Sequence, residues 1–202
     1  MNLSEMSFSE GRYDVKKEPT LRFPVFKGEW KQKKLGLVCN ITTGNLDANA
    51  MVPNGEYDFY TSGTKVFKID KAAFEGPAIT IAGNGNVGYM HLADGKFNAY
   101  QRTYVLTDFS ANRYFLNAII GKNLPHKLYE ETRGSTIPYI VLKTLTDLPI
   151  FLPTKDEQTK IGTFFQTIDV LISETEKELE AYREQKRGML QKMFPKNGEA
   201  TP

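Results

Sequence analysis

The sequence is poor in the residue types that form disulfides and metal centres. Cys39 is the only cysteine among the 202 residues, which excludes an internal disulfide and favours a reducing compartment. His91 and His126 are the only histidines, and neither has a second ligand at metal-binding spacing. We therefore expect no metal site and no cofactor bound by this chain.

Long apolar runs and catalytic motifs are also missing. No stretch approaches the roughly 18 apolar residues of a membrane span, and the first 30 residues lack the apolar segment of a signal peptide. There is no Walker lysine loop, no G-x-S-x-G elbow and no supported cysteine–histidine pair. These absences predict a cytoplasmic protein without membrane contact and without an active site of its own.

One segment imitates a dinucleotide-binding motif. Residues 83–88 match the letters G-x-G-x-x-G and follow an apolar segment at 79–82. In a dinucleotide site, however, a helix opens at this loop and its N-terminus holds the pyrophosphate. Residues 89–95 have the pattern of a strand and a turn instead. We predict a glycine- and asparagine-rich turn whose backbone approaches a ligand or another loop.

The charge is mild and unevenly divided. Residues 1–150 hold 18 basic and 15 acidic side chains, a net charge of +3, whereas residues 151–202 hold 8 and 9. This balance permits a nucleic-acid partner, but charge alone favours an ordinary solvated surface.

The most informative segment is a long amphipathic helix near the C-terminus. Alternating steps of four and three residues begin at Ile161, and eight of the ten positions are apolar. The seam consists of Ile161, Phe165, Ile168, Ile172, Thr175, Leu179, Tyr182, Lys186, Met189 and Met193. Charged residues fill the positions between them. The pattern predicts a coiled-coil seam.

Local signals mark both ends of this helix. Thr154 and Glu157 form a capping box after Pro153, and Pro195 and Gly198 favour a stop. A helix over 154–194 is about 60 Å long. Because this exceeds the diameter of the preceding domain, the seam requires another helix.

The rest of the chain has the pattern of an α+β fold with a strand-rich body. We expect a flexible arm at 1–20, a body at 21–153, the helix at 154–194 and a tail at 195–202. Phe26 and Trp30 are expected core anchors. Predicted strands lie at 35–41, 57–60, 65–70 and 78–82, with a hairpin of 89–92 and 97–106 around a turn at 94–95. A helix at 114–120 ended by Gly121, a short element from 137 and an extended segment at 148–153 follow.

Several groups of residues resemble one known family. The helix, the segment before it and the start of the body are similar to the conserved regions of type I restriction–modification specificity (S) subunits. These matching segments are Glu157-Gln158, Ile161, Phe164-Phe165, Ile168-Asp169, Leu171-Ile172, Lys186, 190–195, 148–153, 21–24, Phe26, Trp30 and 35–36. Residues 55–62, 79–85, 95–97 and 101–104 resemble a target-recognition domain of that family.

The resemblance implies a non-catalytic, sequence-specific DNA-binding role. In this family two recognition domains each read one half of a bipartite double-stranded target, and two antiparallel helices fix the gap between the halves. Modification subunits, which bind S-adenosylmethionine and methylate adenine, dock on this frame, and restriction subunits join them to cleave.

This chain holds one recognition domain and one helix. Its tail at 196–202 echoes residues 15–20, just before the start of the body. The resemblance thus implies either a half-subunit or the first half of a longer subunit. We expect an isologous homodimer through the helix, or pairing with a second half of the same subunit.

Candidate DNA contacts follow from residue type and loop position. Base readers are polar or aromatic residues beside glycines: Tyr60, Ser62, Thr64, Asn84, Asn86, Tyr89 and Gln101. Phosphate contacts are Lys65, Lys68, Arg102, Arg113, Lys122, Lys127, Arg133, Ser135 and Thr136. Each also has a structural explanation: Asn84 and Asn86 shape a turn, for example, and Arg102 pairs with a carboxylate.

Two other classes of function stay open at this point. One is a non-catalytic coiled-coil adaptor whose body binds protein. The other is an enzyme with an unrecognised site, such as a nuclease, which the lack of a metal cluster disfavours.

Overall fold

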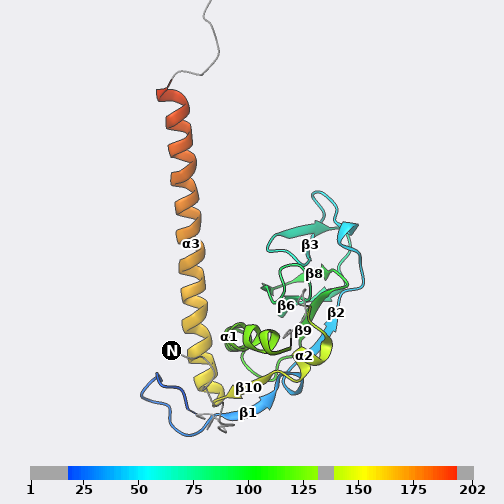
Figure 1. The fold of residues 1–202 in the computed structure, drawn as a ribbon, viewed down its shortest axis with the longest axis vertical. Coiled ribbons are helices and arrows are strands. Elements are labelled where there is room, and N and C mark those ends of the chain that lie inside the picture. Colours follow the sequence, from blue (N-terminus) through cyan, green and yellow to red (C-terminus); the bar gives the residue numbers. More distant parts are fainter. Residues whose placement is uncertain (1–17, 132–138, 195–202) are drawn as a thin grey trace, which may run out of the picture.

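The computed structural model describes residues 18–131 and 139–194 (Figure 1). The strands are β1 (Lys31–Lys34), β2 (Asn40–Thr43), β3 (Tyr57–Tyr60), β4 (Val66–Ile69), β5 (Phe74–Glu75), β6 (Ala78–Ala82), β7 (Met90–Ala93), β8 (Lys96–Ala99), β9 (Thr103–Thr107) and β10 (Pro149–Leu152). The helices are α1 (Arg113–Glu131), α2 (Leu142–Thr146) and α3 (Lys155–Met193), with 3-10 turns η1 (Leu35–Leu37) and η2 (Ala48–Ala50). The expected fold class, a strand-rich α+β body followed by a long helix, is confirmed.

Two four-stranded sheets form the body. One has the order β2-β9-β6-β7 and is antiparallel throughout. The other has the order β4-β3-β8-β5, with β3 and β8 parallel. A separate antiparallel ribbon joins β1 to β10 and so brings the start of the body to the foot of α3.

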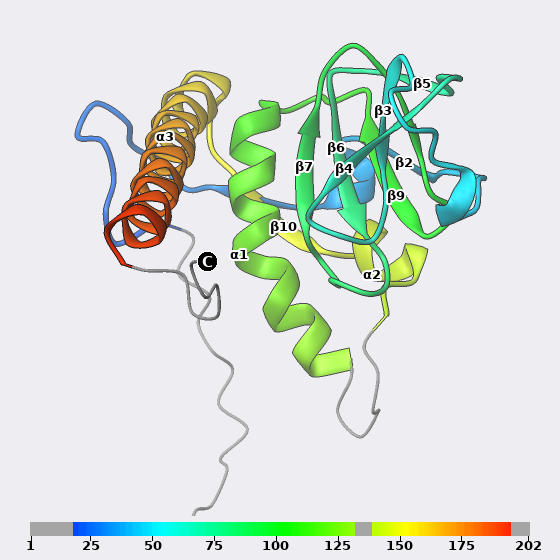
Figure 2. The same ribbon diagram turned by 90° about the horizontal axis from the view of Figure 1, so that it is seen from above.

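The main apolar core lies between the first sheet and its helices. Ile79, Leu106, Leu116, Leu145 and Ile150 come from five different elements and are all inaccessible to solvent. Helix α1 covers this sheet and lies between it and α3 (Figure 2). All five residues of β6 are buried, which explains their continuous run of apolar and small side chains.

A smaller apolar cluster supports the second sheet. Phe97 is its centre and is fully buried, with Tyr60 edge-on to its ring and Phe74 stacked on it. The body is therefore supported by two clusters, and the long helix belongs to neither along most of its length.

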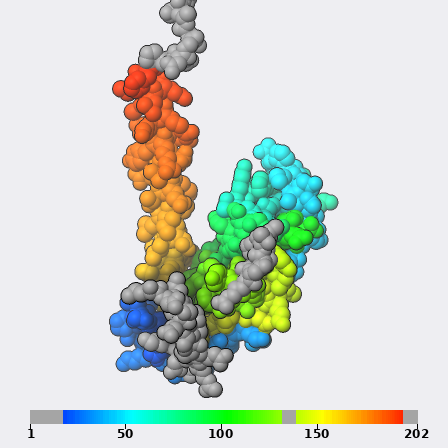
Figure 3. All heavy atoms as spheres, in the orientation of Figure 1, coloured from blue at the N-terminus to red at the C-terminus, as the bar shows by residue number. Residues whose placement is uncertain are grey.

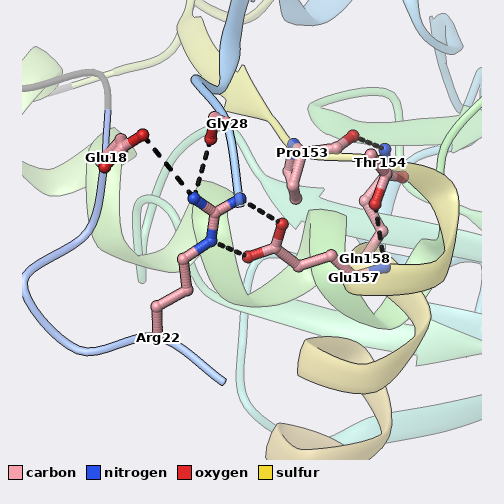
Figure 4. Close-up of polar contacts among 7 residues, drawn as sticks. All are labelled: Glu18, Arg22, Gly28, Pro153, Thr154, Glu157 and Gln158. Atoms are coloured by element: carbon pink, nitrogen blue, oxygen red, sulfur yellow. Dashed lines mark hydrogen bonds and ion pairs between the residues drawn. The ribbon is translucent and has the colours of Figure 1, made fainter. Parts of the chain in front are cut away.

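The long helix α3 begins where the sequence predicts and ends within one residue of the expected end. Thr154 is the N-cap, and its hydroxyl accepts a hydrogen bond from the backbone nitrogen of Glu157 at 3.4 Å. The capping box is only half formed, because the Glu157 carboxylate does not accept a hydrogen bond from the backbone nitrogen of Thr154. Instead it accepts two hydrogen bonds from Arg22, each 2.7 Å long (Figure 4).

These contacts build a joint at the foot of α3. The Glu157 side chain is fully buried, and the guanidinium of Arg22 compensates its charge. Gln158 accepts from the backbone nitrogen of Asn112 at 3.0 Å, directly before α1. Phe23 packs edge-on against Phe164 with 6.2 Å between ring centroids. The N-terminal segment and α1 thus hold the helix from two sides.

The structure differs from the sequence-based predictions at three places. The expected strand at 35–41 starts with η1 instead, because Leu35 and Val38, three residues apart, both face the core. The expected hairpin is wrong: β7 pairs with β6, whereas β8 pairs with β3 and β5. The turn at Gly95 carries the chain from one sheet to the other.

The third difference concerns α1. It continues through Gly121 and Pro125 to Glu131, because Leu116, Ile120 and Leu124 keep one face buried at steps of four. Tertiary burial therefore overrides two residues that disfavour a helix interior.

The remaining expectations fall on shorter segments. Trp30 is half-buried and packs against Phe115 in the core, with 5.9 Å between the rings. Phe26 is half-buried outside that cluster. The arm at 1–17, the start of the element expected from 137 and the tail at 195–202 lie outside the described residues. No helix in the described ranges combines the length and apolarity needed to cross a bilayer.

Gly162 allows α1 and α3 to approach closely, which yields a testable prediction. A Cβ atom there would lie 2.4 Å from Asn112 Oδ1 and 2.9 Å from Phe115 N. We expect Gly162→Ala to lower the free energy of unfolding by about 1–3 kcal/mol. Urea denaturation followed by the fluorescence of Trp30, the only tryptophan, measures this.

The matched control is Gly188→Ala in the same helix. A Cβ atom at position 188 meets nothing within 4 Å, so this change should stabilise the helix by up to about 1 kcal/mol. Equal effects of the two changes would contradict the close-approach argument.

Candidate nucleic-acid interface

Three loops at one end of the sheets bring most of the predicted base readers together. They are the β3–β4 loop (61–65), the β6–β7 loop (83–89) and the β8–β9 turn (100–102), and we call their combined surface the reading face. The backbone nitrogen of Asn86 donates to Ser62 O at 3.0 Å, and that of Gly83 donates to Arg102 O at 2.8 Å. The Ser62 hydroxyl also donates to Asn84 Oδ1.

Glycines make this close packing possible. A Cβ atom on Gly83 would lie 2.5 Å from Arg102 O, and one on Gly85 would press on Ser62 at 3.1 Å. Gly85 also has a φ of +63°, which favours glycine. Residues 83–88 therefore link two strands and precede no helix, and the predicted glycine–asparagine turn is confirmed.

The side chains of the reading face differ in their exposure. Those of Thr64, Lys65, Asn86, Tyr89, Gln101 and Arg102 are exposed, and those of Ser62 and Asn84 are half-buried. Tyr60 is only 4% exposed, because its ring packs against Phe97 and His91. Burial raises the pKa of the Tyr60 hydroxyl to about 12. In this structure Tyr60 supports the loops from below.

Two further residues border the reading face and were missed by sequence reasoning. His91 is half-buried between the rings of Tyr60 and Tyr89, at 5.2 and 4.9 Å between centroids. Tyr139 is 59% exposed, and its neighbour Ile140 donates to Gly83 O at 2.8 Å. No local pattern marks Tyr139, because only the folded chain brings it beside the β6–β7 loop.

The predicted phosphate contacts divide into open and paired cations. Lys65 lies 5.4 Å from the Phe67 ring centroid and is exposed, as are Arg102 and Lys122. Within the described residues no carboxylate pairs with Arg102, so that expected alternative is not observed.

The paired cations already have structural partners. Lys68 binds Asp58 at 2.8 Å, and Lys127 binds Glu131 at 3.1 Å. Arg113 is 10% exposed and binds Asp94 at 2.7 Å, which ties the start of α1 to the turn after β7. Arg133, Ser135 and Thr136 lie outside the described residues.

The composition of the reading face suits a polyanion. Its three loops contain two cations, Lys65 and Arg102, and no acidic residue, and they are rich in hydroxyl and amide groups. Such groups bind phosphate oxygens and base edges. In the described part of the chain, no group of three or more His, Cys, Asp or Glu residues is placed to hold a metal ion.

Comparison with known proteins identifies the family. Residues 27–181 match the type I restriction modification DNA specificity domain. The chain belongs to this family. It is 38% identical over 175 residues to the type I restriction enzyme EcoDI specificity subunit of Escherichia coli, an alignment that covers 86% of this chain and 39% of that protein.

Solved specificity subunits share the fold. The S subunit from M. genitalium superposes with a TM-score of 0.62 at 22% identity, over 77% of this chain and 43% of that one. The HsdS subunit from Thermoanaerobacter tengcongensis gives 0.52 at 19% identity, over 77% of this chain and 41% of that one. The chain therefore spans about two fifths of the length of these relatives.

The specificity domain should lose stability in acid through His91. Burial lowers the pKa of His91 in the folded state, whereas the unfolded chain titrates near the ordinary value of about 6.5. The unfolded state thus binds the proton more readily. The stabilisation is present above pH 6.5 and is lost as the pH falls toward the folded-state pKa.

We expect His91→Gln to flatten the pH dependence of the free energy of unfolding between about pH 7 and about pH 5. Urea denaturation at several pH values measures this slope. An unchanged slope in His91→Gln would show that this histidine does not carry the effect.

Proposed function

We propose that this specificity domain reads one half of a bipartite double-stranded DNA target for a type I restriction–modification complex. The observation that carries the proposal is the reading face: three interlocked loops without an acidic residue, held on rigid strands and followed by a helix with an open seam. The family match also favours DNA recognition over the protein-binding adaptor, because the matched family is a DNA specificity domain.

The reading face offers separate groups for positioning and for sequence reading. Lys65 and Arg102 are exposed cations suited to phosphates, which fix the register on the duplex. Asn86 and Gln101 are exposed amides, and such side chains pair with adenine through one donor and one acceptor. Their backbones are held by neighbouring loops, so the side chains are positioned before DNA binds.

The helix supplies the second part of the proposed function. Most of α3 stands clear of the body (Figure 3). Ile172, Leu179 and Tyr182 of its seam are about half exposed, although they face one side of the helix at coiled-coil spacing. We propose that the seam binds a second copy of the chain, or a second half of the same subunit, and so sets the distance between two reading faces.

The proposed complex includes other subunits. Modification subunits would dock on this frame and bind S-adenosylmethionine, and restriction subunits would join them. This chain would contribute recognition and spacing in the cytoplasm, and no catalytic group.

The first prediction tests DNA recognition through salt dependence. We expect Arg102→Ala to weaken binding to cognate and random duplex by the same factor and to reduce the slope of log K against log [salt] by about 1. Fluorescence anisotropy, with the cognate duplex selected from a random library, measures both quantities. Lys177→Ala on the outer side of α3 is the control and should change neither.

A base reader should behave differently. We expect Asn86→Ala to cost about 1–3 kcal/mol on the cognate duplex and nothing on random DNA. Equal losses on both duplexes would remove Asn86 from the readers. A wild-type chain with no salt-dependent binding to duplex DNA would refute the proposed function.

Self-association is tested at the seam. Leu179→Asp places a carboxylate at the centre of the apolar stripe. We expect it to raise the dissociation constant of the dimer about tenfold, a loss of about 1.4 kcal/mol of association free energy. Sedimentation equilibrium measures the shift. Lys177→Asp, two residues away on the solvated face, should remain dimeric, and a wild-type monomer at tens of micromolar would contradict pairing between copies.

A further inference from the structure

Five aromatic rings form a continuous column that runs from the second sheet to the reading face. Phe74 of β5 stacks on Phe97 of β8, with 5.5 Å between the ring centroids. The ring of Tyr60 stands edge-on to Phe97 at 5.4 Å, and His91 of β7 lies 5.2 Å from Tyr60. The last ring is that of Tyr89, directly before β7 and 4.9 Å from His91. The column therefore connects the smaller apolar cluster with the β6–β7 loop.

Exposure to solvent increases along the column toward the reading face. Phe97 is fully buried and Tyr60 is nearly so. His91 is half-buried, and Tyr89 is 42% exposed. A tyrosine ring is largely apolar, so covering its exposed part in a complex is favourable. The column thus ends in an aromatic surface that a ligand can bury.

The ring of Tyr89 is held in position from several sides. Its carbonyl accepts a hydrogen bond from Ala82 N at 2.8 Å, and its backbone nitrogen donates to Asn86 O at 2.9 Å. Behind it, His91 Nε2 lies 3.4 Å from Gly63 O and so links β7 to the β3–β4 loop. Because a tyrosine has only two rotatable side-chain bonds and this one rests on another ring, burying it costs little conformational entropy.

The surroundings of this ring favour a nucleic-acid base as its ligand. It shares the reading face with the cations Lys65 and Arg102 and the amides Asn86 and Gln101, and the three loops contain no acidic residue. Cations bind the phosphate backbone, whereas an aromatic ring stacks on bases, because every base has a π-face. In an intact duplex each base already stacks on its neighbours, so a ring can stack only where a base step has opened.

We infer that Tyr89 stacks on a base at an opened step of the bound DNA, and that His91 positions the ring for this contact. The inference rests on the proposed function and adds the mode of contact: the reading face distorts the duplex as well as reading it. Pyrimidine–purine steps unstack at the lowest cost. Tyr89 therefore favours targets that carry such a step at its position.

Three substitutions at position 89 separate stacking from other contacts. On the cognate duplex selected from a random library, we expect Tyr89→Ala and Tyr89→Leu to weaken binding by about tenfold to about a hundredfold, and Tyr89→Phe to stay within about twofold of the wild type. Fluorescence anisotropy measures these affinities. Full affinity in Tyr89→Leu would overturn stacking in favour of a simple apolar contact. A loss in Tyr89→Phe equal to that in Tyr89→Ala would assign the contact to the hydroxyl group instead.

Photocrosslinking locates the stacked base directly. Each pyrimidine on both strands of the cognate duplex is replaced in turn by its 5-iodo analogue, which crosslinks under long-wavelength ultraviolet light to an aromatic ring stacked on it. We expect a crosslink to Tyr89 at a pyrimidine–purine step, retained in Tyr89→Phe and absent in Tyr89→Leu. Salt-dependent binding by the wild type without a crosslink to Tyr89 would overturn this inference alone, whereas a lack of salt-dependent binding would refute the proposed function itself.

Tyr139 supplies the matched control. It is exposed beside the same loop, but within the described residues no other ring packs against it. We expect Tyr139→Ala to keep the crosslink at position 89 and an affinity within about twofold of the wild type. Loss of that crosslink in Tyr139→Ala, with its retention in Tyr89→Leu, would contradict the role given to the column.

The positioning role of His91 is tested by restoring the ring. His91→Ala removes one ring from the column, and we expect it to lower both the crosslink yield and the affinity for the cognate duplex by about tenfold. His91→Phe keeps a ring at this place and should restore both. Circular dichroism verifies that each variant is folded under the assay conditions. Equal losses in the two folded variants would show that His91 does not position Tyr89.

Discussion

The buried ion pair between Arg22 and Glu157 is the contact on which the geometry of this protein depends. Glu157 has no solvent contact, and its carboxylate is held by two 2.7 Å hydrogen bonds from one guanidinium. Removing one partner of such a pair typically costs about 3–5 kcal/mol, because the other charge stays buried. The pair joins residues 135 positions apart and attaches the N-terminal segment to the first turn of α3.

The same joint sets the direction in which the helix leaves the body. Gln158 binds the residue before α1 on one side, and Gly162 lets α1 approach the helix backbone on another. Phe23 closes the remaining side at Phe164. A rod held by three neighbours within its first three turns transmits the orientation of the body to its far end. The proposed role as a spacer between two DNA-binding domains requires such a defined orientation.

In the reading face, backbone hydrogen bonds hold the loops together and the exposed side chains are left free for contacts. Backbone hydrogen bonds such as Asn86 N to Ser62 O hold the loops to one another, and the exposed side chains take no part in that attachment. Side chains of Asn86, Gln101 and Arg102 can therefore change without loss of the loop framework. Where a side chain is needed for packing, as with Tyr60 against Phe97, it is withdrawn from the surface.

The sequence alone determined the features that depend on neighbours within one helical turn or one tight turn. The capping threonine, the heptad seam and the end of α3 follow from the pattern of nearby residues, and the place of Ser62, Asn84 and Asn86 in turns follows from the glycines beside them. Tertiary structure decided which strands pair: a turn that suits a hairpin joins β7 to β8, yet β7 pairs with β6, and β8 pairs with β3 and β5. It also decided that Arg113 binds Asp94 and that Glu157 binds Arg22. Those partners lie 19 and 135 residues away, and no local pattern in a chain encodes a charge pair that only the closed fold brings together.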